Sequence, residues 1–373
     1  MKVPFIDITR FEDGFLAEWE SKVAAMSKAA QFVGGPEVAN LEERLARTVG
    51  ATHAVGCANG TDAIQLALRA LDVGPGDTVL VPDATFWATF EAVVNVGATP
   101  FTVDISLADG GICADALEDA IRKVRPKAAI VVHLYGWGPT RLADIRALCA
   151  QEGVKLIEDG AQCFGALYQD NPVLAGALIS TTSFYPAKVL GAAGDGGAVF
   201  TDQPELADKV RRLGNHGRTS HYGHGYVGWN SRLDALQAAF LNLALDHLDA
   251  RVASRRQSAD RYRELLPAAG LSPLDVPAGY VENGYCNVCL MADADAKQGL
   301  ETLLRDRGIG FGNIYPGAMS AQPGAGAYLG GHFGGDGAVR LSRQVLNLPL
   351  FPYMTSDEID YVVQAVFDAG LGR

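Results

Sequence analysis

Short apolar runs alternate with amphipathic stretches between about Asn40 and Glu158. The apolar runs are short enough to be strands, and they are Ala54–Cys57, Thr78–Val81, Thr99–Val103, Ala128–Leu134 and Lys155–Glu158. Apolar residues recur at helical spacing in the stretches between them, which are Ala63–Ala70, Ala88–Val96, Ala114–Arg122 and Arg141–Gln151. Near-continuous apolar strands joined by helices predict an α/β fold with a mostly parallel sheet covered on both faces.

The pattern changes at Ser231. Ser231–Leu266 contains neither glycine nor proline and has apolar residues at helical spacing, so it predicts one long helix that leaves the large domain. A strand, a helix and a strand are predicted after it, over Tyr285–Met291, Ala296–Arg307 and Gly308–Tyr315. We therefore predict a large domain over 1–245, including the N-terminal segment, and a smaller C-terminal α+β domain over 246–373. Gly317–Gly337 is rich in glycine and alanine and predicts a long functional loop.

Charge and composition exclude several classes of partner and site. A net charge of −12 argues against nucleic acid and anionic membranes, because both are polyanions. The longest apolar runs are strand-sized, and the first ten residues do not resemble a signal peptide, so we expect a cytoplasmic protein. The six cysteines are scattered, and Cys286 and Cys289 form a lone C-x-x-C inside an apolar run. We predict no disulfide framework and no metal site.

Lys188 is the strongest candidate for chemistry. It follows Ser183-Phe184-Tyr185-Pro186-Ala187 and precedes the glycine-rich segment Gly191–Gly197. An amine between an apolar strand and a flexible loop can lose solvation and attack a carbonyl to form a Schiff base. A lysine alone is more often a solvated surface residue, so the interpretation depends on the residues that accompany it.

Asp159 ends a predicted buried strand, where a carboxylate is costly unless a cation balances it. The protonated ring nitrogen of pyridoxal phosphate is such a cation, and an aspartate that holds this proton makes the ring an electron sink. Gln162 is placed to bind the ring hydroxyl. The alternatives are that Asp159 caps the next helix and that Gln162 is a solvated helix residue.

Gly60, Thr61 and Asp62 open a helix directly after a strand, where free backbone N–H groups can bind a phosphate. Thr61 or Asp62 can equally be an N-cap, which uses the same groups. Ser183 offers a phosphate hydroxyl, or simply ends a strand. Phe86 begins another helix and can stack on a cofactor ring or belong to the core. Asn230 precedes the long helix, where a cap is the alternative role.

Together these segments resemble the DegT/StrS family of sugar aminotransferases. The resemblance covers most of the chain, from Gly34-Gly35-Pro36 through His133-Leu134-Tyr135-Gly136, Gly194–Ala198, Asn215-His216-Gly217 and Asn230–Asp234 to Tyr315-Pro316. It implies the fold-type I architecture of pyridoxal phosphate-dependent transferases. One departure is Phe164, two residues after Gln162, where the family often has histidine. That departure puts a substrate-side role at position 164 in doubt.

The resemblance also implies roles for individual residues. Lys188 matches the family's Schiff-base lysine, and Asp159 matches the partner of the ring nitrogen. Gln162 matches the residue beside the ring hydroxyl, and Phe86 matches the aromatic residue that stacks on the cofactor ring. Gly60, Thr61, Asp62 and Ser183 match its phosphate-binding positions. The counterpart of Asn230 reaches the phosphate in the neighbouring subunit, which implies a homodimer with two shared active sites.

The expected function is transfer of an amino group, from L-glutamate, to carbon 3 or 4 of a nucleotide-linked keto-sugar. Arg218 or Arg232 is expected to meet the nucleotide. The cleft is expected between the Lys188 face of one subunit and loops of the other, including the N-terminal segment and Gly317–Gly337. Two alternatives remain at this point: an aminotransferase that acts on a ketocyclitol or other sugar in antibiotic assembly, and a regulatory member that binds without catalysis. Some family members carry histidine in place of the lysine and dehydrate sugars, and Lys188 argues against that branch.

Overall fold

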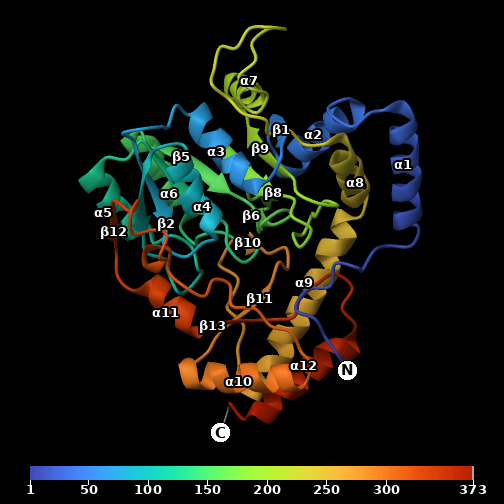
Figure 1. The fold of residues 1–373 in the computed structure, drawn as a ribbon. Helices are drawn as coiled ribbons and strands as arrows, with labels where there is room; N and C mark the ends of the chain where they lie inside the picture. Colours follow the sequence, from blue (N-terminus) through green and yellow to red (C-terminus); the bar gives the residue numbers. More distant parts are fainter. Residues whose placement is uncertain (372–373) are drawn as a thin grey trace.

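A sheet of eight strands organises the larger part of the fold (Figure 1). The computed structural model describes residues 1–371, and the strands lie in the order β1-β9-β8-β5-β4-β2-β3-β12. Their bounds are β1 His53–Cys57, β2 Thr78–Pro82, β3 Thr99–Val103, β4 Ala128–Val132, β5 Lys155–Asp159, β8 Ile179–Ser183, β9 Gly197–Thr201 and β12 Gly331–Phe333. Within the described residues, β9 alone runs antiparallel to its neighbours in this sheet, so the predicted mostly parallel α/β fold is confirmed.

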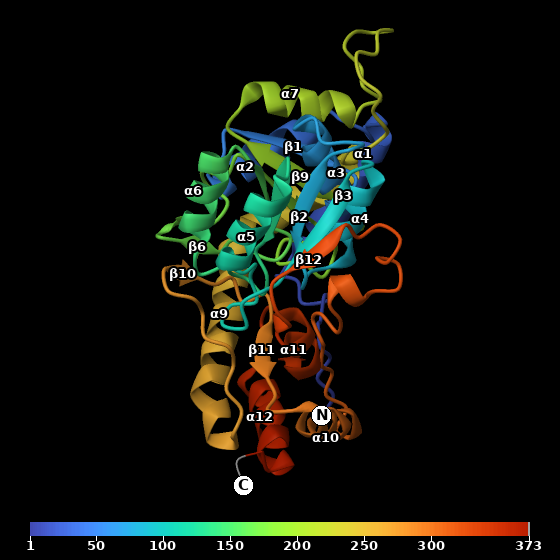
Figure 2. The same cartoon turned by 90° about the vertical axis from the view of Figure 1, so that its left-hand side faces the viewer.

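Helices cover both faces of this sheet. The chain moves along the sheet in one direction through α3 and α4, and returns through α5 and α6. Crossovers between parallel strands are right-handed, so the two pairs fall on opposite faces, as Figure 2 shows. The helices of this part are α1 Phe15–Ala29, α2 Pro36–Val49, α3 Gly60–Ala70, α4 Trp87–Asn95, α5 Ala114–Val124, α6 Leu142–Glu152, α7 Pro204–Leu213 and α8 Ala235–Asp246.

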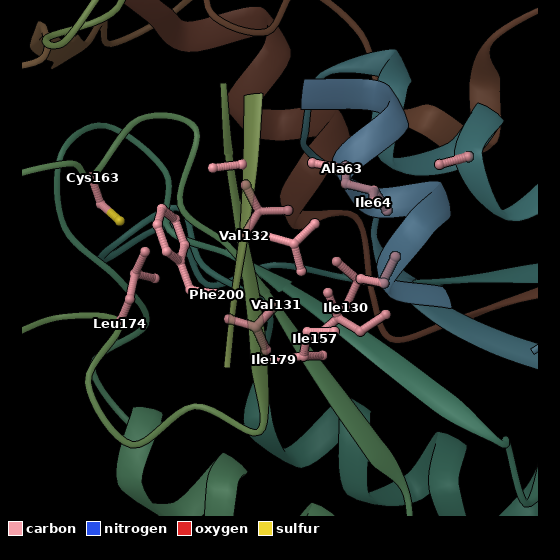
Figure 3. Close-up of a cluster of buried hydrophobic side chains, with 14 of the residues drawn as sticks. Ala63, Ile64, Ile130, Val131, Val132, Ile157, Cys163, Leu174, Ile179 and Phe200 are labelled. Carbon is pink, nitrogen blue, oxygen red and sulfur yellow. The ribbon is translucent and has the colours of Figure 1, made fainter. Parts of the chain in front are cut away.

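The main core lies where α3 packs on the middle strands (Figure 3). Ile130 of β4 and Ile157 of β5 are fully buried, and Ala63 and Ile64 of α3 lie over them. Burying one such aliphatic side chain contributes about 1.5–3 kcal/mol, so this contact fixes α3 firmly on the sheet. The first turn of α3 is thereby held beside the carboxyl ends of the strands, where ligands bind in folds of this class.

A second hydrophobic core forms below the sheet. Tyr262, Leu300 and Val362 are buried in it, and Val3 from the N-terminus packs there as well, with its N–H donating to the Gly308 carbonyl at 3.1 Å. The elements are α9 Leu248–Leu265, β11 Asn287–Leu290, α10 Ala294–Asp306, β13 Val345–Leu348 and α12 Ser356–Ala369, with β11 and β13 antiparallel. The exact boundary near residue 245 stays a prediction.

Three short strands and one helix complete the fold. A small antiparallel sheet in the order β10-β6-β7 joins Leu167–Tyr168 (β6), Asn171–Pro172 (β7) and Tyr280–Val281 (β10). Helix α11 spans Gly337–Gln344 and leads into β13. None of the helices within residues 1–371 is both long and apolar enough to cross a lipid bilayer.

The prediction of one helix over Ser231–Leu266 is wrong. Helix α8 ends at Asp246, and α9 begins at Leu248 after His247, whose φ of −108° and ψ of 2° are not helical. The break places α8 against α2 in the main core and lets α9 carry Tyr262 into the second core. Burial in two cores outweighs the hydrogen bonds lost at one turn, and neither glycine nor proline is needed to make the break.

The prediction of a strand over Gly308–Tyr315 is also wrong. Ile309 and Gly312 make only isolated bridges, to Val3 and Asn347, and the chain then turns toward the main sheet. A side chain at Gly312 would collide with the ring of Phe5, with the added carbon 2.5 Å from the nearest ring atom. The N-terminal segment therefore occupies the space that a neighbouring strand would need.

The segment Gly317–Gly337 is more ordered than the predicted loop. It contains a short 3₁₀ turn over Met319–Ala321 and β12, the outer strand beside β3. Buried Asp83 accepts hydrogen bonds from the Ser320 N–H and hydroxyl at 2.7 and 2.8 Å. Asp104 accepts from the N–H groups of Gly335, Gly337 and Ala338 at 2.9–3.1 Å. Two carboxylates at strand ends therefore hold this segment, and sequence periodicity cannot reveal such a contact.

Replacement of Asp104 tests this attachment. Asp104→Ala leaves three backbone N–H groups without their acceptor, so we expect the free energy of unfolding to fall by about 2–4 kcal/mol, measured by urea denaturation. Asp336→Ala is the matched control, because this exposed residue makes no side-chain cap, and we expect a change within about 0.5 kcal/mol. Equal stability of the two variants would refute the assignment.

Candidate active site

A cavity of about 530 Å³ opens at the carboxyl ends of the strands. We call it the Lys188 cavity. Seven residues singled out from the sequence line it, although they come from the ends of four different strands, β1, β2, β5 and β8, or from the segments that follow them: Gly60, Thr61, Phe86, Asp159, Gln162, Ser183 and Lys188. The fold therefore brings together side chains that lie up to 128 positions apart in the chain, between 60 and 188.

The first turn of α3 forms one wall of the cavity. Asn59 is its N-cap: the Asn59 side chain accepts from the Asp62 N–H at 2.8 Å, and the Asn59 carbonyl accepts from the Ala63 N–H at 3.0 Å. The N–H groups of Gly60 and Thr61, which have no acceptor inside the helix, face the lining and can bind an anion.

Glycine is required at position 60 because the helix approaches β8 closely. A Cβ there would lie 2.7 Å from the Cβ of Ser183 and 3.1 Å from its Oγ. This contact puts the Ser183 hydroxyl beside the free N–H groups of α3. Three neighbouring donors at the positive end of a helix make a site suited to a phosphate group.

Asp159 forms the floor of the cavity. It is 7% exposed, and its Oδ1 accepts from the Ala161 N–H at 2.9 Å. Burial raises the pKa of Asp159, while the Ala161 N–H and the positive charge of Lys188 act in the opposite direction. A buried carboxyl group in this state gains free energy when a cation binds beside it, because the cation stabilises the charged form.

The adjacent carboxylate, Glu158, is paired internally. Arg146 donates to both Glu158 oxygens at 2.7 and 2.9 Å, and His133 Nε2 lies 2.9 Å from Oε2. Although burial favours the neutral acid, these hydrogen bonds lower the pKa of Glu158. Successive strand residues point to opposite faces, so Glu158 is directed away from the cavity and toward α6, the helix that contains Arg146.

Lys188 lies in the turn after β8, with its N–H donating to the Tyr185 carbonyl at 2.8 Å. Its Nζ lies 3.4 Å from the hydroxyl of Tyr285 and 5.2 Å from the centre of that ring. Buried Asn283 accepts from the Tyr285 N–H at 2.9 Å and so fixes the tyrosine backbone. The amine is therefore held at the cavity by a residue from the C-terminal part of the chain.

Gln162 and Phe86 complete the lining on either side of Tyr315. The Gln162 amide donates to the Tyr315 hydroxyl at 2.7 Å, and its oxygen accepts from the Tyr135 N–H at 2.8 Å. Phe86 is the residue before α4 and remains 59% exposed, with its ring centre 6.1 Å from that of Tyr315. An exposed aromatic ring over a cavity leaves a face on which a planar ligand can stack.

Other residues predicted for the site lie elsewhere in this chain. Asp62 sits in the first turn of α3 but does not line the cavity. Asn230, Arg218 and Arg232 also lie outside the lining, and Arg232 donates to Asn215 at 3.2 Å. Phe164, at the position where the family often has histidine, is buried in the core, edge-on to the ring of Phe184.

Sequence reasoning missed the contributions of Tyr285 and Tyr315 to the cavity. Both come from the part of the chain beyond residue 245, and no spacing relates them to Lys188. Tyr315 belongs to the Tyr315-Pro316 match, and Tyr285 begins an apolar run. An aromatic residue next to proline or within an apolar run gives no signal that distinguishes a cavity wall from a core position.

The chemistry of these residues fits pyridoxal phosphate. The free N–H groups of Gly60 and Thr61 and the hydroxyl of Ser183 are suited to bind the phosphate. The buried carboxylate of Asp159 is suited to pair with the protonated ring nitrogen. The amine of Lys188 is the group that would react with the aldehyde carbon. Within the described residues, no group of three histidine, cysteine, aspartate or glutamate side chains is placed to hold a metal ion.

Comparison with known proteins gives a consistent result. The model of the DegT/DnrJ/EryC1/StrS aminotransferase family matches residues 16–367. A UDP-N-acetyl-3-dehydro-α-D-glucosamine 3-aminotransferase of Acidithiobacillus ferrooxidans is 38% identical, over 98% of this chain and 97% of that protein.

Two solved structures are similar throughout. DesV of S. venezuelae, in complex with a ketimine intermediate, has a TM-score of 0.92 and 34% identity, covering 99% of this chain and 98% of that one. NtdA of Bacillus subtilis, with the bound cofactor PMP, has a TM-score of 0.89 and 28% identity, covering 100% of this chain and 86% of that one.

The buried Glu158 network provides a test of the structure beneath the site. Glu158→Gln leaves Arg146 and His133 without a carboxylate, so we expect a loss of about 2–4 kcal/mol in the free energy of unfolding at pH 7. The pKa of Glu158 is lowered on folding, so its contribution is present above the ordinary value of 4.5 and is lost as the pH falls. The Gln variant should therefore lose less stability than the wild type between pH 6 and pH 3.

Chemical denaturation across this range measures both effects. Exposed Glu152→Gln serves as the control and should behave like the wild type. A Glu158→Gln variant with the wild-type pH profile would contradict the assigned network.

Proposed function

This chain belongs to the DegT/DnrJ/EryC1/StrS aminotransferase family, and on that premise we propose that it transfers an amino group to a nucleotide-linked 3-oxo-hexose with pyridoxal phosphate as cofactor. The observation that carries the proposal is the shared cavity. An amine, a buried carboxylate that forms no salt bridge with another described residue, and the positive end of a helix all line it, at Lys188, Asp159 and Gly60. These are the three groups that the cofactor needs.

The cofactor, when bound, supplies an aldehyde that reacts with amines and a protonated ring that accepts electrons from the substrate carbon. Asp159 would keep that ring protonated, because its buried carboxylate gains most from a positive neighbour. Gly60, Thr61 and Ser183 would hold the phosphate. Phe86 would cover one face of the ring, and Gln162 would lie beside the ring hydroxyl.

Lys188 would hold the cofactor in the resting enzyme and move protons during transfer. Its Nζ lies next to the Tyr285 hydroxyl at 3.4 Å, so the released amine remains at the cavity and can carry a proton from one carbon to another. The aromatic rings of Phe86, Tyr285 and Tyr315 would restrict access of water to the reacting atoms.

The class of substrate is proposed from the similar proteins. The relative from A. ferrooxidans is named for a UDP-linked 3-dehydro sugar, so we favour amination at carbon 3 over carbon 4. L-glutamate is the proposed donor. A ketocyclitol substrate would be supported instead if a panel of ketones showed turnover only without an attached nucleotide.

We further propose a homodimer with shared active sites. The segment between α7 and α8 projects from the body of the molecule in Figures 1 and 2. On this segment Tyr222 is 88% and Val227 is 84% exposed, so it presents apolar surface that a second copy would cover. Asn230 lies on the same segment, outside the cavity of its own chain.

The role of Lys188 can be tested directly. Lys188→Ala removes the amine, so we expect the release of 2-oxoglutarate from L-glutamate to fall by at least about 10³-fold. In the wild type, reduction with borohydride should fix the cofactor to the peptide that contains Lys188, as mass spectrometry would show. Exposed Lys155→Ala is the control for both measurements, and attachment at another lysine would overturn the assignment.

The shared site can be tested by mixing two inactive variants. If Asn230 acts in the partner's site, a hybrid of Lys188→Ala and Asn230→Ala chains has one site with both defects and one intact site. Random exchange of subunits should then restore about one quarter of the wild-type activity. Absence of recovery, with exchange verified by native mass spectrometry, would mean that Asn230 does not serve the neighbouring site.

A further inference from the structure

A second cavity of about 360 Å³ lies behind Lys188. Its walls are the turn from Pro186 to Gly194, the N-terminal residues 7–11, and the α9 residues Arg251 and Arg255. Lys188 lines both this cavity and the Lys188 cavity, so the two spaces share one wall. We call the second space the Arg255 cavity.

Two of the three arginines that line it are already paired. Arg10 forms two salt bridges: its Nε lies 2.8 Å from Asp7 Oδ2, and its Nη2 lies 2.5 Å from Glu358 Oε1. Arg251 donates to both oxygens of Glu12, at 2.7 and 2.8 Å. Because each of these guanidinium groups has a carboxylate partner, neither provides a net charge for a ligand.

Arg255 is different. It is 4% exposed, and within the described residues it forms no ion pair with a carboxylate. Its Nη1 makes only long contacts to the carbonyls of Gly284 and Leu350, at 3.3 and 3.4 Å, and its buried Nε has no partner among residues 1–371. Burial lowers the pKa of Arg255 to about 10.

A buried guanidinium without a counter-ion is unfavourable in the folded protein. Binding of an anion in the cavity would remove this cost, because the guanidinium fork matches the two oxygens of a carboxylate. The unpartnered Nε, together with an Nη1 that makes only long contacts, leaves donors for such a pair. The Arg255 cavity therefore combines space, charge and unused hydrogen-bond donors.

Arg255 and Lys188 line the same cavity and contact adjacent residues, Gly284 and Tyr285. The Gly284 carbonyl accepts from Arg255, and the next residue, Tyr285, places its hydroxyl 3.4 Å from Lys188 Nζ. A side chain at Gly284 would lie 2.6 Å from the Arg255 Cβ, so the two segments are in close contact. An anion on Arg255 would thus occupy the cavity that Lys188 also lines.

We propose that the Arg255 cavity binds a carboxylate group of the amino donor. The inference rests on the proposed function, since it names the donor as a small dicarboxylic amino acid whose amine is directed toward the Lys188 side. A nucleotide-linked sugar suits this cavity poorly, because its two phosphates would meet only one unpaired guanidinium. A five-carbon dicarboxylate brings one carboxylate to Arg255 and is small enough for the space.

Glutarate is the probe that tests this inference, because it has both carboxylates but no amine and cannot be turned over. We expect calorimetric titration of the full-length protein to detect glutarate binding, and Arg255→Gln to weaken it by about 30-fold or more. Arg255→Lys, which keeps the charge but not the fork, should weaken it less. Arg256→Gln is the matched control: Arg256 does not line the cavity and donates to the Gly165 carbonyl, so binding should change less than about twofold.

Folding of the variants is measured separately. Since Arg255→Gln removes an unpaired buried charge and retains an amide that can reach the same carbonyls, its melting temperature without ligand should not fall below that of the wild type. In steady-state assays the KM for L-glutamate should rise with Arg255→Gln, while the KM for the keto-sugar should not.

The inference is overturned if Arg255→Gln binds glutarate as the wild type does, or if the wild type does not bind glutarate. It is also overturned if chloride or phosphate displaces glutarate at equal concentration, which would show an unspecific anion site. Turnover of L-glutamate without glutarate binding would refute the inference and leave the proposed function intact. Glutarate binding that depends on Arg255 without any turnover would support the carboxylate site and refute the proposed function.

Discussion

The site depends on the different surroundings of two neighbouring carboxylates at the end of β5. Glu158 points to one face, where Arg146 and His133 neutralise it. Asp159 points to the other face, where residues 1–371 provide no salt bridge. One carboxylate is therefore satisfied by the protein itself. The other remains in a buried position that favours a cation, and this asymmetry makes the Lys188 cavity suitable for a positively charged ring.

Close backbone packing supports this arrangement. The absence of a side chain at Gly60 lets α3 approach Ser183, and a Cβ at Gly197 would lie only 2.4 Å from the Asn59 carbonyl. The helix N-terminus can therefore reach the ends of β8 and β9 only with glycine at both positions. The burial of Ile64 and its neighbours then holds the helix rigidly against the sheet, so the anion-binding N–H groups need little ordering when a ligand binds.

Much of this could be predicted from the sequence, because strand ends, glycine-rich turns and a buried aspartate have local signatures. The parallel sheet and the seven residues that line the cavity fall in this class. The failures have a common cause, which is that the decisive contacts are distant in sequence. The break at His247 depends on the second core. The loss of a strand at Gly312 depends on Phe5, and the order of the segment after Gly317 depends on Asp104. No local pattern contains that information.

The pairing of the N-terminus with the second core has a consequence for the order of folding. Val3 exchanges hydrogen bonds with Gly308 and Gly310, at 3.1 and 2.7 Å, so Val3 can pair only after a segment about 300 positions downstream has been made. All strands of the large sheet except β12 precede Gly308 and can pair during synthesis, while Val3 still lacks its partner. During that interval Phe5 and Val3 remain exposed on the nascent chain, where chaperones bind apolar segments of this kind.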